Sequence, residues 1–268
     1  MRKLKTPTFR AVLDDKFITK DIIKYIYSGE LADRFRTRHM KLLIGEVEHE
    51  EIMYRLGAPS THDALLPGLQ NYYRSSVAQA LVEHYTKSHT DVADMFTGIV
   101  TDVQVRATTR AFSKLLVEGG VASKDVMRYR ISLPIKGIDE SMAPEQRAIF
   151  SGKVPHAFDF LHWFYIRRVG FTQEEDKAIR EWLEPFAKFI RGEDVTWGTS
   201  DVTQFRHLTE DAKIEIVQDP YWGNLMDTAA VLRRVVELEG GVIETIKKVG
   251  RVGEPNDKET TKRQKVAD

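Results

Sequence analysis

The sequence of 268 residues contains no cysteine, which excludes disulfide bridges, thiol nucleophiles and cysteine metal sites. It also contains no apolar run approaching 18 residues, so we expect no transmembrane helix. The first ten residues, MRKLKTPTFR, are basic, but no apolar stretch follows them as it would in a secretory signal. These absences predict a protein that, as the chain stands, is cytoplasmic.

The chain carries no excess of charge of either sign, because 40 Lys and Arg balance 40 Asp and Glu. A balanced charge predicts no general attraction to nucleic acid or to an anionic membrane. Apolar residues make up 42% of the chain and charged residues 30%, which is typical of a globular domain. The length suffices for one large domain or two small ones.

Three motifs that would identify a cofactor or a nucleophile are missing. There is no glycine-rich phosphate loop, since the pairs Gly119-Gly120 and Gly240-Gly241 are isolated and predict helix ends. There is no G-x-S-x-G nucleophile motif. His49 and Glu50 begin a zinc signature, but Met53 stands where the second histidine belongs. We therefore predict no cofactor and no metal.

The stretch MKLLIGEVEHEE at residues 40–51 combines an apolar run with a cluster of acids and one imidazole. This pattern predicts a buried strand over 40–46, with a break at Gly45, followed by a polar loop. In α/β proteins, chemistry collects on loops at the carboxyl ends of parallel strands. By charge density alone, the acids on this loop predict a solvated surface.

Periodicity predicts the other elements. Expected helices cover 19–28, 30–36, a segment capped by Thr61, 77–87, 91–117 with a break near Asp102, 172–191 with a kink at Pro185, and 225–236. The helix at 172–191 is expected to start with a capping box of Thr172 and Glu175 and to carry an apolar stripe. Expected strands cover 126–133, 205–208 and 213–217, the last two as a hairpin. We expect 6–18 to be extended, 134–155 to be irregular and 246–268 to form a disordered charged tail. The remainder, 1–245, is predicted to form the C-terminal portion of one domain.

Two histidines lie in the segment GKVPHAFDFLHWF. His156 follows Gly152 and Pro155, a setting in which a histidine is most often a packed or hydrogen-bonded structural residue. His162 lies between large apolar residues and is predicted to be in the core. His39, His62, His84, His89 and His207 have no informative neighbours in the sequence.

Six segments, taken in order, resemble the C-terminal half of the type B carboxylesterases, the α/β-hydrolase family that includes the cholinesterases. KLLIGEVEHEE resembles the family's "LLIGTNxDEG" strand and acid loop, and GKVPHAFDFLHWF resembles its "G-x-x-H-x-x-D-x-x-F-V-F" segment. The other matches are 9–32, 99–112, 126–132 and 180–197. The resemblance implies an α/β fold with few sheet strands and many helices, the N-terminal half of the sheet being absent.

The resemblance places Glu50 on the family's triad acid and His156, 106 positions later, on its general base. It implies acyl transfer from a small-molecule ester, in which His156 takes a proton from a serine and Glu50 orients the imidazole. The family's serine and oxyanion hole lie in its N-terminal half. The family's loop glycine is Glu51 here, its D-G turn is Asp14-Asp15, and its F-x-C-P segment is altered at 103–108.

Three interpretations follow from the sequence. The chain is part of a serine esterase separated from its nucleophile, with a complementing N-terminal half or protein partner. Alternatively, it is a non-catalytic binding or interaction module with a hydrolase-like fold. In the third interpretation the resemblance misleads, and the chain is a helical scaffold or a metal-dependent enzyme that uses the carboxylates of 46–51. Under either of the first two, the strand at 40–46 has an open edge that favours self-association.

Overall fold

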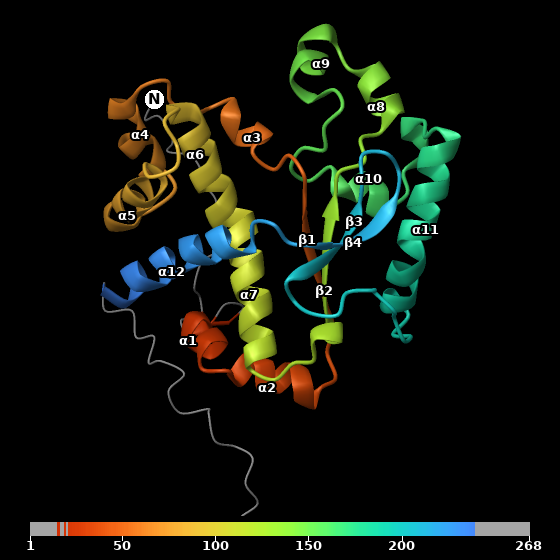
Figure 1. Cartoon of the computed structure of the whole chain (residues 1–268), viewed down its shortest axis with the longest axis horizontal. Helices are drawn as coiled ribbons and strands as arrows, with labels where there is room; N and C mark the ends of the chain where they lie inside the picture. Colours follow the sequence, from red (N-terminus) through yellow and green to blue (C-terminus); the bar gives the residue numbers. More distant parts are fainter. Residues whose placement is uncertain (1–14, 17–18, 20, 239–268) are drawn as a thin grey trace, which may run out of the picture.

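The computed structural model of the chain describes residues 15–16, 19 and 21–238, and it contains one mixed sheet of four strands (Figure 1). The strands are β1 (Leu42–Val47), β2 (Val126–Ile131), β3 (Gln204–Leu208) and β4 (Ile214–Gln218), in that spatial order. β1, β2 and β3 are parallel, while β4 returns antiparallel to β3. The predicted strands and hairpin are confirmed, and the sheet with its many helices is that expected of part of an α/β-hydrolase fold.

Twelve α-helices are found in the described residues. Before β2 they are α1 (Ile22–Tyr27), α2 (Glu30–Thr37), α3 (Ile52–Arg55), α4 (His62–Leu69), α5 (Ser75–Tyr85), α6 (Val92–Thr101) and α7 (Ala107–Glu118); after it they are α8 (Lys136–Ser141), α9 (Pro144–Phe150), α10 (Asp159–Trp163), α11 (Gln173–Ile190) and α12 (Trp222–Leu238). The predictions for 1–14, 17–18, 20 and 239–268, including most of the extended segment, the charged tail and Gly240-Gly241, concern residues outside the described ones. No described helix is long and apolar enough to cross a membrane.

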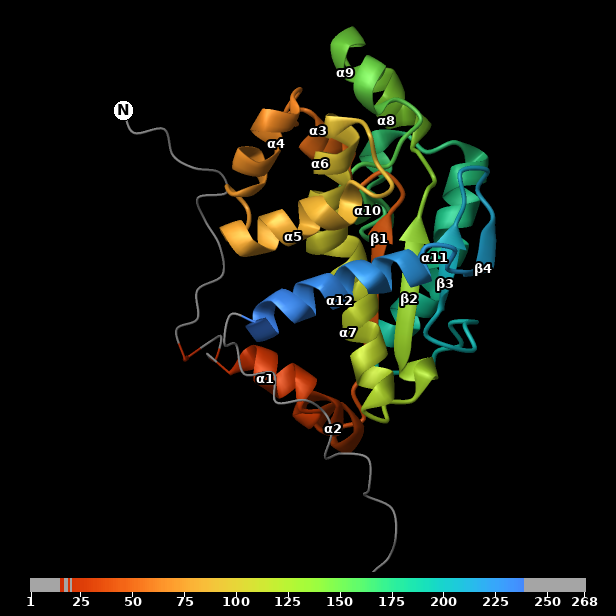
Figure 2. The same cartoon turned by 60° about the vertical axis from the view of Figure 1, so that its left-hand side comes forward.

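Helices cover both faces of the sheet, with α7 and α12 on one side and α10 and α11 on the other (Figures 1 and 2). Period-two alternation divides the strand residues between these faces. Val47 and Ile131 pack against Ile179 and Trp182 of α11 in one buried cluster. A second cluster joins α4, α5 and α6 around Leu81 and packs beside the sheet rather than on it. The sheet thus lies between two layers of helices.

The predicted break at Gly45 is wrong, since β1 runs through this glycine to Val47. The glycine is needed for close approach rather than for a turn. A Cβ atom at residue 45 would lie 2.2 Å from the carbonyl oxygen of Tyr129 and 2.4 Å from its ring. The absence of a side chain therefore lets β2 and its tyrosine pass close to β1.

Two expectations for the irregular and helical segments are corrected. Residues 134–155 are not wholly irregular, because the short helices α8 and α9 form within them, α9 starting with Pro144 at its first position. The helical stretch predicted over 91–117 does not break near Asp102. It continues through a π-helical segment, Asp102–Arg106, that joins α6 to α7.

The capping box predicted at the start of α11 is present. The Thr172 hydroxyl accepts a hydrogen bond from the Glu175 amide at 3.2 Å, and the Glu175 carboxylate accepts one from the Thr172 amide at 2.8 Å. We expect Thr172→Ala to lower the free energy of unfolding by about 1 kcal/mol. Urea denaturation would measure this loss, with Thr86→Ala, an exposed threonine at the end of α5, as the control. Equal stability of the two variants would contradict the capping role.

Candidate active site

The acidic stretch 46–51, which we name the acid loop, continues from the carboxyl end of β1. Its Glu46 and Glu50 are each only 4% exposed, so the prediction of a solvated charged surface is wrong for these two residues. The backbone turns so that the Val47 amide donates a hydrogen bond to Oε1 of Glu50 at 2.9 Å. The loop therefore points one carboxylate inward and fixes one of its oxygens.

The segment 152–158, which we name the histidine loop, lies against the acid loop. The His49 amide donates to the Val154 carbonyl at 3.1 Å, and His49 and Pro155 form an isolated parallel β-bridge. The two loops are thus joined through their backbones. His49 contributes this junction, and its Nδ1 lies 3.4 Å from the Val154 amide.

The structure brings Glu50 and His156 together across this junction. Oε2 of Glu50 lies 2.5 Å from Nδ1 of His156, and the carboxylate side chain is 5% exposed while the imidazole is 47% exposed. Within the described residues, Nδ1 is the imidazole atom for which a hydrogen bond is found. The buried acid therefore occupies one ring nitrogen of a half-exposed imidazole, and Nε2 is the nitrogen left to exchange a proton with a reactant.

The hydrogen bond that His156 donates to Glu50 raises the pKa of His156, and this effect exceeds the lowering caused by partial burial. The pair therefore contributes stability that is fully present just below the ordinary histidine pKa of 6.5 and is lost as the pH rises through the raised folded-state pKa. We expect Glu50→Gln to lower the pKa of His156, because the neutral amide no longer favours the imidazolium. A histidine NMR titration would detect the change, with Glu48→Gln as a matched control on the same loop. An unchanged His156 pKa in Glu50→Gln would contradict the pairing.

The helix that follows the histidine loop is held by an aromatic residue from the sheet. The Tyr129 hydroxyl donates to Oδ2 of Asp159 at 2.9 Å, and its ring packs edge-on against Trp163 with centroids 4.9 Å apart. Burial, followed by the charge of Asp159, raises the pKa of Tyr129, so the phenol stays protonated and remains a donor. His162, predicted to be in the core, is 1% exposed and bonds the Leu133 carbonyl at 2.8 Å.

A network of buried ion pairs among arginines and carboxylates lies on the other face of the sheet. It was not predicted from the sequence. Arg110 of α7 contacts Oε2 of Glu46 and Oδ2 of Asp219, both at 2.7 Å. Arg128 also reaches Asp219 at 2.7 Å, and Arg130 reaches Glu46 at 2.5 Å. Burial raises the pKa of Glu46, but the charges and hydrogen bonds of its arginines outweigh that effect and lower it to about 2. The signal in the sequence was the pair of arginines, Arg128 and Arg130, at alternate positions of the strand predicted over 126–133.

Two serine hydroxyls in the described residues contact an imidazole, and neither contact involves His156. Ser132 Oγ lies 2.7 Å from Nε2 of His207 and 3.0 Å from Oε2 of Glu48. The other contact joins Ser88 to His89 at 2.9 Å. Ser132 is only 2% exposed, and its carboxylate partner contacts the serine rather than the histidine. This order differs from that of a catalytic triad, in which the acid orients the base.

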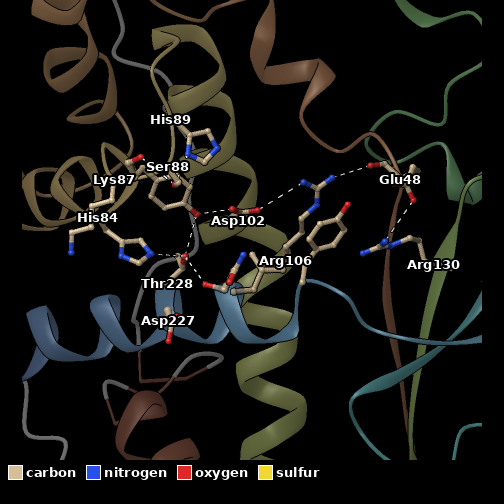
Figure 3. Close-up of a pocket in the computed structure, with 14 residues that line it drawn as sticks. Glu48, His84, Lys87, Ser88, His89, Asp102, Arg106, Arg130, Asp227 and Thr228 are labelled. Carbon is tan, nitrogen blue, oxygen red and sulfur yellow. Dashed lines mark hydrogen bonds and ion pairs between the residues drawn. The ribbon is translucent and has the colours of Figure 1, made fainter.

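No group of three or more potential metal ligands lies together among the described residues. A cavity of about 490 Å³ opens between α5, α12 and the ends of β1 and β2, and neither Glu50 nor His156 lines it (Figure 3). Its walls carry basic, acidic and histidine side chains, among them Lys87, Asp227 and His84. The cavity therefore borders the acid loop at Glu48 without including the Glu50–His156 pair itself.

Comparison with known proteins links the chain to esterases. It is 34% identical over 230 residues to an uncharacterized esterase/lipase of Schizosaccharomyces pombe, a match that covers 82% of this chain and 41% of that protein. It is 30% identical over 233 residues to a carboxylic ester hydrolase of Gibberella moniliformis, with the same coverage of 82% and 41%. No model of a protein family matches the chain.

The chain resembles carboxylic-ester hydrolases. This similarity supports an esterase-like family in general, and it does not distinguish the type B carboxylesterases from other esterases. The chain spans about two fifths of the length of these relatives.

Proposed function

We propose that the chain supplies the acid and the base of a type B carboxylesterase whose nucleophilic serine and oxyanion hole lie in polypeptide outside this sequence. The observation that carries the proposal is the 2.5 Å contact between buried Glu50 and half-exposed His156. The esterase names of the relatives support the reaction class, and the absence of G-x-S-x-G supports an external serine.

In the proposed reaction, Nε2 of His156 removes the proton of the serine hydroxyl as the oxygen attacks the ester carbonyl carbon. Glu50 holds the Nδ1 hydrogen and stabilises the imidazolium that forms. The imidazolium then protonates the departing alcohol and leaves an acyl-enzyme. Water hydrolyses this ester in a second step, with His156 again acting as the base. The substrate is a small-molecule carboxylic ester.

An ester-hydrolysis assay on two proteins tests the proposal. We expect recombinant residues 1–268 alone to show no His156-dependent turnover of 4-nitrophenyl butyrate. We expect turnover from a protein that contains this chain together with its nucleophile segment. Activity of residues 1–268 alone that disappears in Ser132→Ala would place the nucleophile within this chain and contradict the proposal.

The alternative function is a non-catalytic binding or interaction module with a hydrolase-like fold. The observation that favours it is the absence of the nucleophile motif from a chain that retains a paired acid and base. The transcript from which the chain is translated discriminates between the two functions. A transcript that encodes a G-x-S-x-G motif in the same reading frame as the chain supports the esterase. Transcripts that all lack such a motif support the binding module.

A further inference from the structure

We propose that Arg106 is a positioning residue for the triad acid, supported by a chain of buried hydrogen bonds that lines the 490 Å³ cavity. The inference rests on the proposed function, because it concerns how Glu50 is held in place. Arg106 is separated from Glu50 by 56 positions in the sequence and comes from the segment between α6 and α7. It reaches the acid loop from this distant segment and contacts Glu48 and Glu51.

One nitrogen of the Arg106 guanidinium contacts the acid loop on both sides of Glu50. Nη2 donates to the backbone carbonyl of Glu48 at 2.9 Å and to Oε2 of Glu51 at 3.1 Å. Nη1 lies 3.9 Å from Oδ1 of Asp102, the interaction drawn beside that of Glu48 in Figure 3. A guanidinium presents its donors in a rigid plane, so it can hold two points of a loop at a fixed spacing.

The backbone under Arg106 has an unusual form. Residues 102–106 form a π-helical turn, in which the Ala107 amide bonds the Asp102 carbonyl. Each residue of an α-helix turns the chain by about 100°, so the extra residue of a π-turn changes which side chains face the sheet. Such turns are frequent at functional sites. Here the turn lets Arg106 reach the acid loop while Arg110, one turn later, reaches Glu46.

A chain of hydrogen bonds holds the carboxylate behind Arg106. The Tyr85 hydroxyl donates to Oδ2 of Asp102 at 2.6 Å and lies 3.2 Å from the Thr228 hydroxyl of α12. Figure 3 shows these contacts in sequence from His84 through Thr228 and Asp102 to Arg106 and Glu48. Tyr85 is 4% exposed and Thr228 is 2% exposed, so the support is buried although it lies beside the cavity.

The opposite side of the acid loop has anchors of its own. The Glu48 amide donates to the Ile131 carbonyl at 2.9 Å, and the His49 amide donates to Val154. These bonds hold the start of the loop against β2 and the histidine loop. On the other side, the Glu51 carbonyl accepts hydrogen bonds from the Tyr54 and Arg55 amides as α3 begins, and Arg106 adds the contact to the Glu51 carboxylate from a distant segment. We therefore expect loss of Arg106 to loosen Glu50 without unfolding the site.

The test combines a His156 NMR titration of residues 1–268 with kinetics of the longer protein. Arg106→Lys retains the charge but loses the planar two-point contact, and Arg106→Gln loses both. We expect each to lower the pKa of His156 toward its value in Glu50→Gln. We also expect each to lower kcat by about 10- to 100-fold, since small displacements at an active site cost on this order, while KM stays within about twofold. Tyr85→Phe should produce a smaller change in the same direction.

Arg191→Lys is the matched control, because Arg191 forms an exposed pair with Glu193 at the end of α11, away from the acid loop. A His156 pKa that is unchanged in the Arg106 variants but lowered in Glu50→Gln would overturn the positioning role and leave the proposed function intact. An unchanged pKa in Glu50→Gln would overturn both. If Arg106→Gln does not fold, Arg106→Lys and Tyr85→Phe decide the question.

Discussion

Replacing His156 with alanine is expected to lower kcat for ester hydrolysis by on the order of 10⁶-fold in a protein that contains this chain and its nucleophile. In the proposed reaction the imidazole takes the serine proton, since Nδ1 contacts Glu50 and the His156 side chain is half-exposed. Without it, the serine hydroxyl must lose its proton to water, and the leaving alcohol lacks an acid. Initial rates with 4-nitrophenyl butyrate measure the loss.

The control for this prediction is His62→Ala, which removes an exposed histidine at the start of α4. We expect its kcat to match that of the unmodified protein. Urea denaturation of both variants separates a chemical effect from unfolding. If His156→Ala retains a tenth or more of the activity, the general-base role is wrong.

Replacing Glu46 with glutamine is expected to lower the free energy of unfolding at pH 7 by about 3 kcal/mol. Glu46 is the shared partner of Arg110 and Arg130 on the buried face of the sheet, and the glutamine leaves both guanidinium groups without that charge. Removal of one partner from a buried ion pair is costly because the remaining charge is neither solvated nor compensated. Glu184→Gln, in an exposed pair with Lys188, should cost about 0.5 kcal/mol or less.

The same carboxylate makes stability depend on pH. Because the pKa of Glu46 is lowered to about 2 in the folded state, its contribution is complete above the ordinary carboxyl pKa of 4.5 and is lost as the pH falls toward 2. Unfolding by urea at intervals from pH 7 to pH 2 should show this loss. Glu46→Gln should be less sensitive to acid over the same range. If the free energy of unfolding falls equally with pH in the two proteins, Glu46 is not the source of the acid sensitivity.

Local patterns in the sequence predicted the elements whose formation depends on nearby residues. The capping box and apolar stripe of α11 lie within one helix, so the sequence predicted the cap at Thr172 and the extent of the helix to within one residue. The β3–β4 hairpin is likewise local. Helices α8 and α9 were missed because each is shorter than two α-helical turns and lies among glycine and proline residues.

The burial of the acid loop could not be predicted locally, because the partners that allow it lie far away in the sequence. Glu46 meets Arg110 and Arg130, which are 64 and 84 positions distant. A run of acidic residues is expected to be exposed to solvent unless distant basic residues compensate its charge, and the sequence does not show which residues those are. The Glu50–His156 contact was expected from family resemblance, whereas its geometry required the parallel pairing of β1 with β2 and the bridge between the two loops.

Labelling of the active serine would show directly whether Glu50 and His156 serve a nucleophile that lies outside this sequence. The protein would be isolated from its natural source with an antibody against residues 1–268, treated with a fluorophosphonate that phosphonylates activated serines, and digested for mass spectrometry. We expect one labelled serine, in a peptide outside residues 1–268, and no labelled serine in the His156→Ala variant. A label on Ser132 or another serine of this chain, labelling that survives His156→Ala, or no labelled serine at all would contradict it.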